Sequence, residues 1–315
     1  MLSIKEITND SYPIAVLKRK SKVMETIYFT EPTRKTNSQK VPFEKQIAEY
    51  LEDSTDESYK LSEDYSFEMV PTISKDSGTN PRFINFYLSA SNSGKSFQIA
   101  NLCRRYLQLF PDNLIAYASA NPIENDINYE DIKDKIKVVD VINLESQIDF
   151  QDEQYRNSLW IFDDCDSGFS VSMEDLDERL TPEELKKMTV TDKQKALNML
   201  KKKCEIASEW VNKSIKSFMM NGRKMKQSLC IVGHKPFEGR GENQIINEAT
   251  GIVLFPTGIR KNILQEFIEK KLSFTKEDAY DILYNRPWYR YDWLYISHRS
   301  SVPFIITEDT IKLYP

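Results

Sequence analysis

The sequence is poor in the residues from which proteins build metal sites and covalent cross-links. Its 315 residues include two histidines and four cysteines. No two cysteines form a C-x-x-C pair, and they are scattered along the chain as Cys103, Cys165, Cys204 and Cys230. These absences exclude a structural zinc site and a disulfide framework, and they predict buried apolar thiols in a reducing compartment.

Long apolar stretches and an excess of positive charge are also lacking. No apolar run is long enough to span a bilayer, and the first residues do not resemble a signal peptide, so we expect an intracellular protein with no membrane span. The formal net charge of −5 excludes nucleic-acid binding through bulk positive charge, although a local basic face would be sufficient. The length is enough for a sizeable core, in one large domain or two smaller ones.

Apolar runs alternate with helical patterns from residue 83 onward. Strands that are separated by helices predict an α/β fold, with a mainly parallel sheet and helices on both faces. The predicted strands are 83–88, 114–118, 136–142, 158–162, 229–232 and 252–255.

The patterns divide the chain into three parts. Residues 1–80 are predicted to be a small β-containing N-terminal extension with a hairpin before residue 33. Its acidic stretch 52–68 is predicted to be a linker or a partner-binding segment of marginal order. Residues 81–260 are predicted to be the core, with a helical insertion over 167–205. A lysine-rich helical stretch ends that insertion, and a separate helix that ends at Gly222 follows it. Residues 261–315 are predicted to supply one helix, capped at Thr275, and an aromatic β-tail that packs on the core.

A loop of small residues follows the first core strand and ends in Gly-Lys-Ser, which is typical of a phosphate-binding loop. Small side chains let successive backbone N–H groups surround phosphate oxygens, and the N-terminus of the following helix adds a positive dipole. Lys95 is expected on the β- and γ-phosphates and Ser96 on Mg²⁺. The predicted nucleotide contacts are Ser89, Ala90, Ser91, Asn92, Ser93, Gly94, Lys95, Ser96 and Phe97.

The loop departs from the usual pattern at its first position, where Ser89 replaces glycine. If the position requires only a small side chain, the serine is a tolerated variation. If it requires a positive φ, the serine strains the loop and a degenerate site is favoured. An ordinary Ser/Asn/Gly turn with an exposed lysine is the alternative to a phosphate loop.

A pair of acids, Asp163 and Asp164, follows the buried strand 158–162. An acid at the end of such a strand holds Mg²⁺ through water, and a second acid polarises the attacking water. We assign the first role to Asp163 and the second to Asp164. Glutamate is usual at the second place, so the shorter Asp164 requires a closer water or help from Asp166. An ordinary acidic turn is the alternative.

The strand 229–232 supplies the third element, because it leads into His234 and is preceded by Arg223. A polar residue at the end of a strand beside the phosphate loop can contact the γ-phosphate or the attacking water, and we assign this role to His234. Arg223 is predicted to reach the γ-phosphate of a neighbouring subunit as an arginine finger. The alternatives are a surface turn histidine and an ordinary cation at a helix C-terminus.

The ordered motifs Ser-Gly-Lys-Ser, Ile-Phe-Asp-Asp, Asn-Gly-Arg and His-Lys-Pro resemble those of the viral genome-packaging ATPases of the FtsK–HerA superfamily. The chain is most similar to the poxvirus, giant-virus and virophage type. Those enzymes typically have Asn-Gly-Arg-His before a strand that ends in Gln, and here Lys224 and His234 stand at the two differing places. The tail 291–296 is similar to a C-terminal segment of such enzymes, so the resemblance covers residue 83 to the C-terminus.

The resemblance implies a P-loop NTPase core of the ASCE, RecA-like kind that uses ATP and Mg²⁺. It implies a homo-oligomeric ring, a pentamer or hexamer, that hydrolyses ATP at its subunit interfaces and moves double-stranded DNA into a preformed capsid. A capsid vertex or portal protein would be a partner, and the host cell cytoplasm, virus factory or virion the location. Candidate contacts to the DNA backbone are Lys224, Lys226, Lys235 and Arg240. The lysines of 186–203 are a second candidate set, for which a solvated helix face is the favoured alternative.

Two other functions stay open at this point. Ser89, Asp164 and His234 favour a catalytically degenerate nucleotide-binding protein that acts as a structural or assembly factor. A P-loop nucleotide kinase is disfavoured, because kinases have no need of paired acids on a separate strand and the chain lacks an Arg-rich lid pattern.

Overall fold

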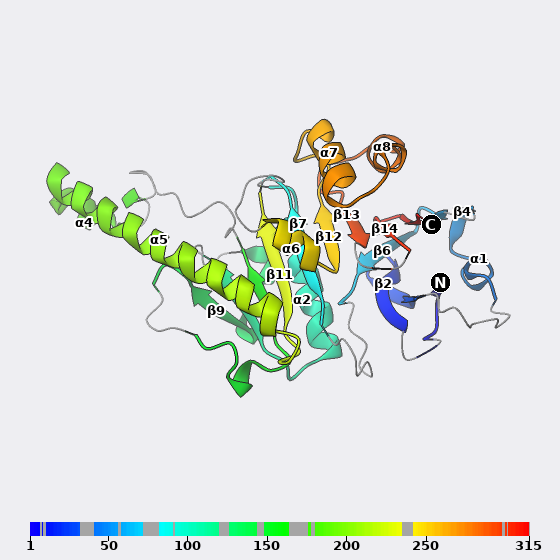
Figure 1. Ribbon diagram of the computed structural model, residues 1–315, viewed down its shortest axis with the longest axis horizontal. Coiled ribbons are helices and arrows are strands. Elements are labelled where there is room, and N and C mark those ends of the chain that lie inside the picture. The colour runs from blue at the N-terminus through cyan, green and yellow to red at the C-terminus, as the bar shows by residue number, and fades with distance from the viewer. Residues whose placement is uncertain are drawn as a thin grey trace.

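Figure 1 shows the computed structural model of the chain. It describes residues 1–6, 8, 11–31, 41–55, 58–71, 82–90, 92–119, 126–143, 148–163, 176–177, 180–234, 242–297, 300 and 302–314. The strands of these residues form one sheet of four strands and one of eleven. The larger sheet carries the candidate site, and the smaller one packs against the same apolar core.

The smaller sheet is antiparallel and has the order β1-β3-β2-β6. Its central hairpin confirms the one predicted before residue 33: Ala15 lies opposite Ile27, and Lys20 takes a left-handed φ of 55° in the turn. The strands are β1 (Leu2–Ser3), β2 (Ser11–Arg19), β3 (Lys22–Thr30) and β6 (Tyr65–Met69).

The stretch 52–68 is not the linker of marginal order that its acidic composition predicts. It contains β4 (Leu51–Ser54), β5 (Ser58–Leu61) and β6, preceded by the short helix α1 (Phe43–Gln46). β5 pairs with a strand near the C-terminus and β6 with β2. The prediction fails because alternate side chains here, including Tyr59, Leu61 and Phe67, are buried against partners far away in the sequence. The domain boundaries themselves stay a prediction.

The larger sheet has a parallel part in the order β12-β7-β11-β10-β8-β9. All six of its strands agree with predicted strands to within two residues, because each is a short, nearly continuous apolar run. They are β7 (Ile84–Leu88), β8 (Ile115–Ser119), β9 (Ile136–Asp140), β10 (Leu159–Phe162), β11 (Ser228–Gly233) and β12 (Gly251–Leu254). The carboxyl ends of these strands therefore lie along one edge of the sheet.

An antiparallel extension continues the larger sheet beyond β12 in the order β13-β14-β15-β5-β4. The aromatic tail thus does form strands, and they are β13 (Leu294–Ser297), β14 (Phe304–Ile306) and β15 (Thr310–Leu313). Since β13 pairs with β12, the segment that precedes β13 lies close to the carboxyl ends of the parallel strands.

Helices cover both faces of the larger sheet, as predicted. The side chains of β7 alternate: Phe86 and Leu88 belong to one apolar core, and Tyr87 belongs to the other. On the Tyr87 face lie α2 (Lys95–Leu109) and the smaller sheet. On the opposite face lie α5 (Val190–Asn221), α6 (Glu242–Glu248), α7 (Lys261–Lys271) and α8 (Lys276–Tyr284). Short connections are α4 (Pro182–Lys187), η2 (Ile127–Tyr129), η3 (Lys133–Lys135) and η4 (Glu153–Tyr155).

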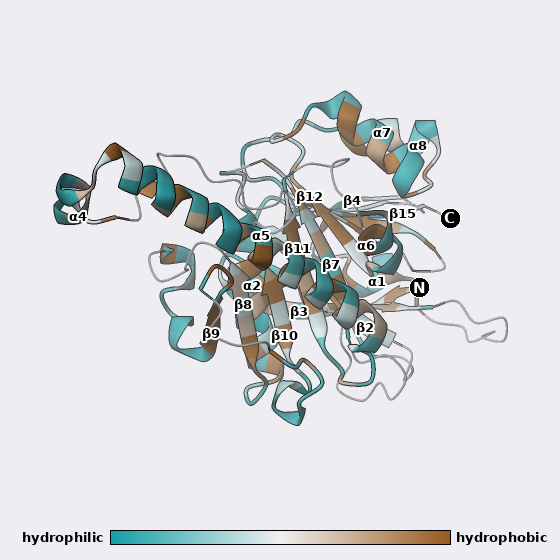
Figure 2. Cartoon of the chain, turned by 60° about the vertical axis from the view of Figure 1, so that its left-hand side comes forward, coloured by the Kyte–Doolittle hydropathy of each residue, from teal (hydrophilic) through white to brown (hydrophobic). Residues whose placement is uncertain are grey.

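Two helices differ from the sequence-based expectation. α7 was not predicted, because no side chain caps its N-terminus at Arg260 and so the usual start signal is missing. The lysine-rich stretch and the helix after it are one helix, α5, which begins with a capping box of Thr189 and Asp192. Figure 1 shows that the N-terminal half of α5 extends away from the sheet, whereas Figure 2 shows the apolar strands enclosed behind its C-terminal half.

Three of the four cysteines lie in the described residues, and all three are buried thiols outside any disulfide, as predicted: Cys103, Cys204 and Cys230. Burial raises the pKa of the Cys103 thiol to about 12 and that of Cys230 well above its usual range. Cys165 lies outside the described residues.

Candidate nucleotide-binding site

The predicted phosphate loop connects the end of β7 at Leu88 to the start of α2 at Lys95. Two positions of the loop have left-handed backbone, Asn92 with a φ of 60° and Gly94 with a φ of 99°. Glycine takes such a φ at little cost, and asparagine is among the other residues most often found there. The local sequence therefore supplies the turn that carries the chain from the strand into the helix. Ser91 lies outside the described residues.

Ser89 does not take the strained conformation that would favour a degenerate loop. The described non-glycine residues with a positive φ are Lys20, Asn92, Asn157, Lys226, Ser273 and Tyr291, and Ser89 is not among them. Its side chain is fully buried, and its Oγ donates to the carbonyl of Ala90 at 3.0 Å. A Cβ on Gly258 would lie 3.0 Å from this Oγ, so the space that the serine occupies depends on a glycine opposite.

Lys95 lies inside the loop, and its side chain is almost completely buried. Its Nζ donates to the carbonyls of Ser89 and Ala90 at 3.0 and 3.1 Å, and it lies 3.3 Å from Nδ1 of His234. The loop therefore holds its cation beside the loop's own oxygens, where an entering phosphate would take over the contact. The predicted pair of Lys95 and His234 is brought together because β11 lies directly beside β7.

Asp163 follows the last residue of β10, on the other side of β11. Its backbone N–H donates to the carbonyl of Ala118 at 3.0 Å, and the hydroxyl of Tyr117 donates to its carboxylate. Tyr117 is on β8, so a neighbouring strand fixes the orientation of the predicted Mg²⁺ acid. Sequence reasoning missed Tyr117, since nothing in a buried apolar run marks which tyrosine reaches the acid. Asp164 and Asp166 lie outside the described residues.

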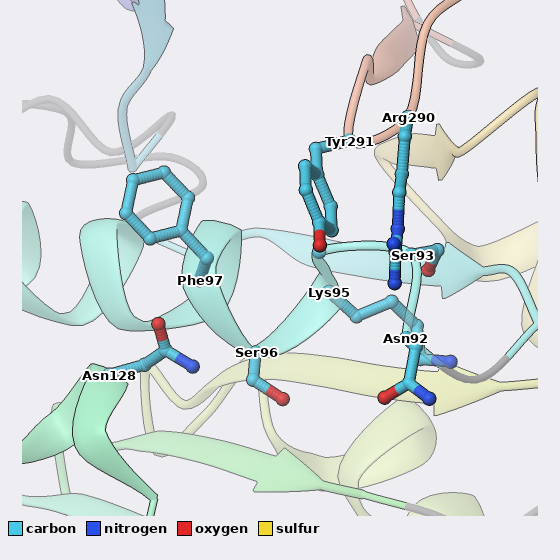
Figure 3. Close-up of a pocket in the computed structure, with 9 residues that line it drawn as sticks. Asn92, Ser93, Lys95, Ser96, Phe97, Asn128, Arg290 and Tyr291 are labelled. Carbon is cyan, nitrogen blue, oxygen red and sulfur yellow. The ribbon is translucent and has the colours of Figure 1, made fainter.

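A cavity of about 530 Å³ opens on the outer side of the loop. Its lining includes the predicted residues Asn92 to Phe97 and three that sequence reasoning missed, Asn128, Arg290 and Tyr291. Figure 3 shows the side chains of Arg290 and Tyr291 reaching the loop from the segment that precedes β13. The Oγ of Ser93 lies in this lining, is buried, and has no hydrogen-bond partner among the described residues. A buried hydroxyl without a partner indicates a place for a polar ligand.

The residues present suit Mg²⁺, which prefers oxygen ligands and is usually bound through one or two carboxylates together with substrate phosphates. Ser96 lines the cavity. Asp163 follows β10, which is separated from β7 by β11 alone. When bound, the ion would neutralise charge on the phosphates. In the described part of the chain, no cluster of three or more His, Cys, Asp or Glu could hold a metal by itself.

Arg223 is not brought to this site within the chain. It lies in the turn between α5 and β11, at the amino ends of the parallel strands, where Asn157 donates to the carbonyl of Met225 at 2.9 Å. Strands of five or six residues are roughly 17–20 Å long, so this edge is far from the phosphate loop. Lys224 and Lys226 are exposed at the same edge as Arg223. Lys235 and Arg240 lie outside the described residues.

None of the helices in the described ranges is both long enough and apolar enough to cross a membrane.

Comparison with known proteins finds similarity among solved structures. No protein-family model and no curated protein matches the sequence. The genome packaging NTPase B204 of Sulfolobus turreted icosahedral virus 2, in complex with AMPPCP, is 15% identical with a TM-score of 0.42, over 72% of this chain and 97% of that chain. B204, the DNA-packaging ATPase from Sulfolobus Turreted Icosahedral Virus, is 15% identical with a TM-score of 0.43, over 72% and 98%. The pCW3 conjugation coupling protein TcpA is 10% identical with a TM-score of 0.38, over 96% and 77%.

Two of these structures are thus named as genome-packaging or DNA-packaging enzymes. Similarities of this size do not carry residue roles or ligands from one protein to another. The P-loop NTPase fold of this chain rests on its own features, which are the loop between β7 and α2 and the position of β11 between β7 and β10.

Proposed function

We propose that the chain is a DNA-translocating ATPase that packages a viral genome. The observation that carries the proposal is the convergence of Lys95, His234 and Asp163 at the carboxyl edge of three neighbouring strands. In hydrolysis Lys95 would bind the β- and γ-phosphates, Ser96 and Asp163 would hold Mg²⁺, and Asp164 would polarise the attacking water. His234, beside Lys95, would contact the γ-phosphate or that water.

The partners in this proposal follow from the resemblance. Subunits would assemble into a pentameric or hexameric ring with ATP at their interfaces, and double-stranded DNA would pass through the pore into a capsid. Arg223 lies at the edge opposite its own loop, so it would have to act on the γ-phosphate of a neighbouring subunit. Lys224 and Lys226 share its exposed turn and would contact the DNA backbone without reading sequence.

The alternative, a degenerate assembly factor, loses one of its three supports. Ser89 favours the assembly factor only if its position requires a positive φ, and the φ of Ser89 is not positive. Asp164 and His234 are still departures from the family pattern, and only turnover measurements distinguish the two functions.

The deciding experiment is ATP hydrolysis measured with and without linear double-stranded DNA. We expect turnover that rises when DNA is added. Lys95→Ala should abolish it, and Asp164→Asn should bind ATP without hydrolysing it. Lys213→Ala is the control, because Lys213 is an exposed lysine on α5 with a side chain 79% exposed. Binding of ATP by the wild type with no turnover, with or without DNA, would favour the assembly factor.

The trans role of Arg223 has its own test. Preparations of Arg223→Ala alone and of Lys95→Ala alone should both be inactive. Mixed rings that contain both variants should regain part of the turnover, because some interfaces then combine an intact loop with an intact arginine. The absence of any recovery in mixed rings would rule out this role.

A further inference from the structure

The cavity beside the phosphate loop is also lined by side chains that have no role in the proposed phosphate contacts. Two large aromatic side chains line it, Phe97 from the first turn of α2 and Tyr291 from the turn before β13. They are 52% and 54% exposed, whereas most aromatic residues of the chain are buried. Neither ring contacts another aromatic ring in the described part of the chain. Each ring can therefore stack on a flat group in the cavity.

The backbone at Tyr291 is strained in a way that places this ring. The N–H of Asp292 donates to the carbonyl of Tyr289 at 3.1 Å, and the Asp292 carboxylate accepts from the N–H of Tyr289 at 2.8 Å. Tyr291 has a φ of 79° in this turn, the value of a type II turn at a position where glycine is usual. A tyrosine rarely adopts a positive φ, and residues with such strained backbone are concentrated at ligand-binding and active sites. The conformation therefore indicates a function for the Tyr291 ring.

Tyr291 also lies close to the phosphate loop. A Cβ built on Gly94 would lie 3.3 Å from Cδ1 of Tyr291. The ring therefore lies next to the residue before Lys95, between the loop and Phe97, as Figure 3 shows. A nucleotide whose phosphates occupy the loop would have its base in the same cavity, which both rings line.

Arg290 differs from the other arginine nearby in the tail. Arg286 is paired with Asp309 at 2.5 Å and lies 3.7 Å from Asp292. Arg290 makes no ion pair within the described residues, and its guanidinium lies 5.0 Å from the centre of the Tyr291 ring. Figure 3 shows its nitrogen end directed toward Ser93, the residue with the unpartnered hydroxyl. A cation at this place suits a phosphate oxygen.

We propose that Phe97 and Tyr291 bind the base of a nucleoside triphosphate by stacking, while Arg290 binds its phosphates. This inference rests on the proposed nucleotide site. Stacking accepts every base, and purines offer more area than pyrimidines. Of the three lining residues outside the loop and α2, Asn128 is the one with a side-chain amide, and this amide already donates to Asp126 at 2.7 Å. The site therefore takes purine nucleoside triphosphates as a class and discriminates weakly between ATP and GTP.

The test compares the affinities of ATP, GTP, CTP and tripolyphosphate by calorimetry with Mg²⁺ present. Tyr291→Ala should weaken ATP and GTP about tenfold, as loss of one stacking partner does, and leave tripolyphosphate unchanged. Arg290→Ala should weaken all four ligands. Tyr291→Phe should bind as the wild type does, and Tyr291→Gly should resemble Tyr291→Ala although glycine accepts the turn without strain.

Tyr280→Ala is the matched control, because Tyr280 is also 54% exposed but is on α8 and stacks on Tyr284. It should leave all affinities unchanged. If the wild type binds none of the four ligands, the proposed nucleotide site itself is wrong. If the wild type binds ATP, and Tyr291→Ala binds it equally well or loses tripolyphosphate to the same degree, the stacking site is overturned and the phosphate site stands. A preference for ATP over GTP of more than a hundredfold would also overturn it.

Discussion

The ammonium of Lys95 lies 3.3 Å from Nδ1 of His234. An ammonium can only donate, so Nδ1 must accept, and the proton of a neutral imidazole is then on Nε2. His234 is thereby oriented by the same lysine that is expected to bind phosphate. A histidine in an ordinary surface turn would have no reason to be held there, so the relationship supports the role that we propose for His234.

His234→Gln should keep most of the hydrolysis rate, because glutamine can also present an acceptor to Lys95 and a donor to the site, and it is the residue of the family resembled. His234→Ala should lower the rate about 100-fold, since the loss of a positioned polar group at a reacting centre typically costs that much. ATP affinity should change little in both variants. Single-turnover hydrolysis and calorimetric binding check the two parts. Equal rates for His234→Ala and the wild type would show that His234 takes no part in hydrolysis and is an ordinary turn residue.

Tyr117 offers a test of the Mg²⁺ side of the site. Its hydroxyl donates to the carboxylate of Asp163, and groups that orient a metal ligand typically change metal affinity or activity about 10- to 100-fold when removed. Tyr117→Phe should therefore raise the Mg²⁺ concentration needed for half-maximal hydrolysis by roughly that factor. The measurement is the rate as a function of Mg²⁺ at fixed ATP.

Tyr106→Phe is the control for that prediction. Tyr106 is buried like Tyr117, but its hydroxyl donates to the carbonyl of Asn157, before the start of β10. It should not alter the Mg²⁺ dependence. If both variants shift it equally, the effect comes from general loosening of the core and not from Asp163.

The sequence-based predictions succeeded where a local pattern was sufficient. Each parallel strand is an apolar run that can be recognised without knowing which strand it pairs with. The small residues of the phosphate loop likewise indicate its conformation from the local sequence alone. β5 and β6 were missed because their partners are β15 and β2, which no local signal reveals. Arg290 and Tyr291 were missed as site residues for the same reason: the pairing of β13 with β12 brings them to the loop.

Arg82 provides a prediction about stability that does not involve the site. Its buried guanidinium donates to the carbonyls of Phe218 and Met219 at 2.7 and 3.2 Å, and so it satisfies the end of α5. Arg82→Ala removes both charge-assisted hydrogen bonds and leaves the Phe218 carbonyl with only the N–H of Gly222 at 2.9 Å, so it should lower the free energy of unfolding by about 3 kcal/mol. Denaturant unfolding measures the change. Arg19→Ala is the control, because Arg19 and its partner Asp64 are mostly exposed and such a pair contributes about 0–1 kcal/mol.

The buried thiols predict a loss of stability at alkaline pH. Burial raises the pKa of Cys103 to about 12 in the folded protein, whereas an unfolded thiol titrates near 8.5. Between these values the unfolded state has lost the proton and the folded state has kept it, so the free energy of unfolding falls as pH rises. From pH 8.5 to 9.5, below the tyrosine range, Cys103→Ala should show a shallower fall than the wild type under reducing conditions. An identical slope would contradict the burial of this thiol.

The contact between Ser89 and Gly258 allows the unusual first position of the loop to be tested by a double-mutant cycle. A Cβ on Gly258 would lie 3.0 Å from Oγ of Ser89, and 3.2 and 3.3 Å from the N and Cβ of Ala90. Gly258→Ala should therefore displace the loop and lower ATP affinity. Ser89→Gly alone should bind ATP as the wild type does, because the serine has no positive φ to relieve. The double variant should recover part of the affinity, since it removes the closest of the three contacts but not those to Ala90. Additive effects of the two substitutions would show that Ser89 and Gly258 do not share this space.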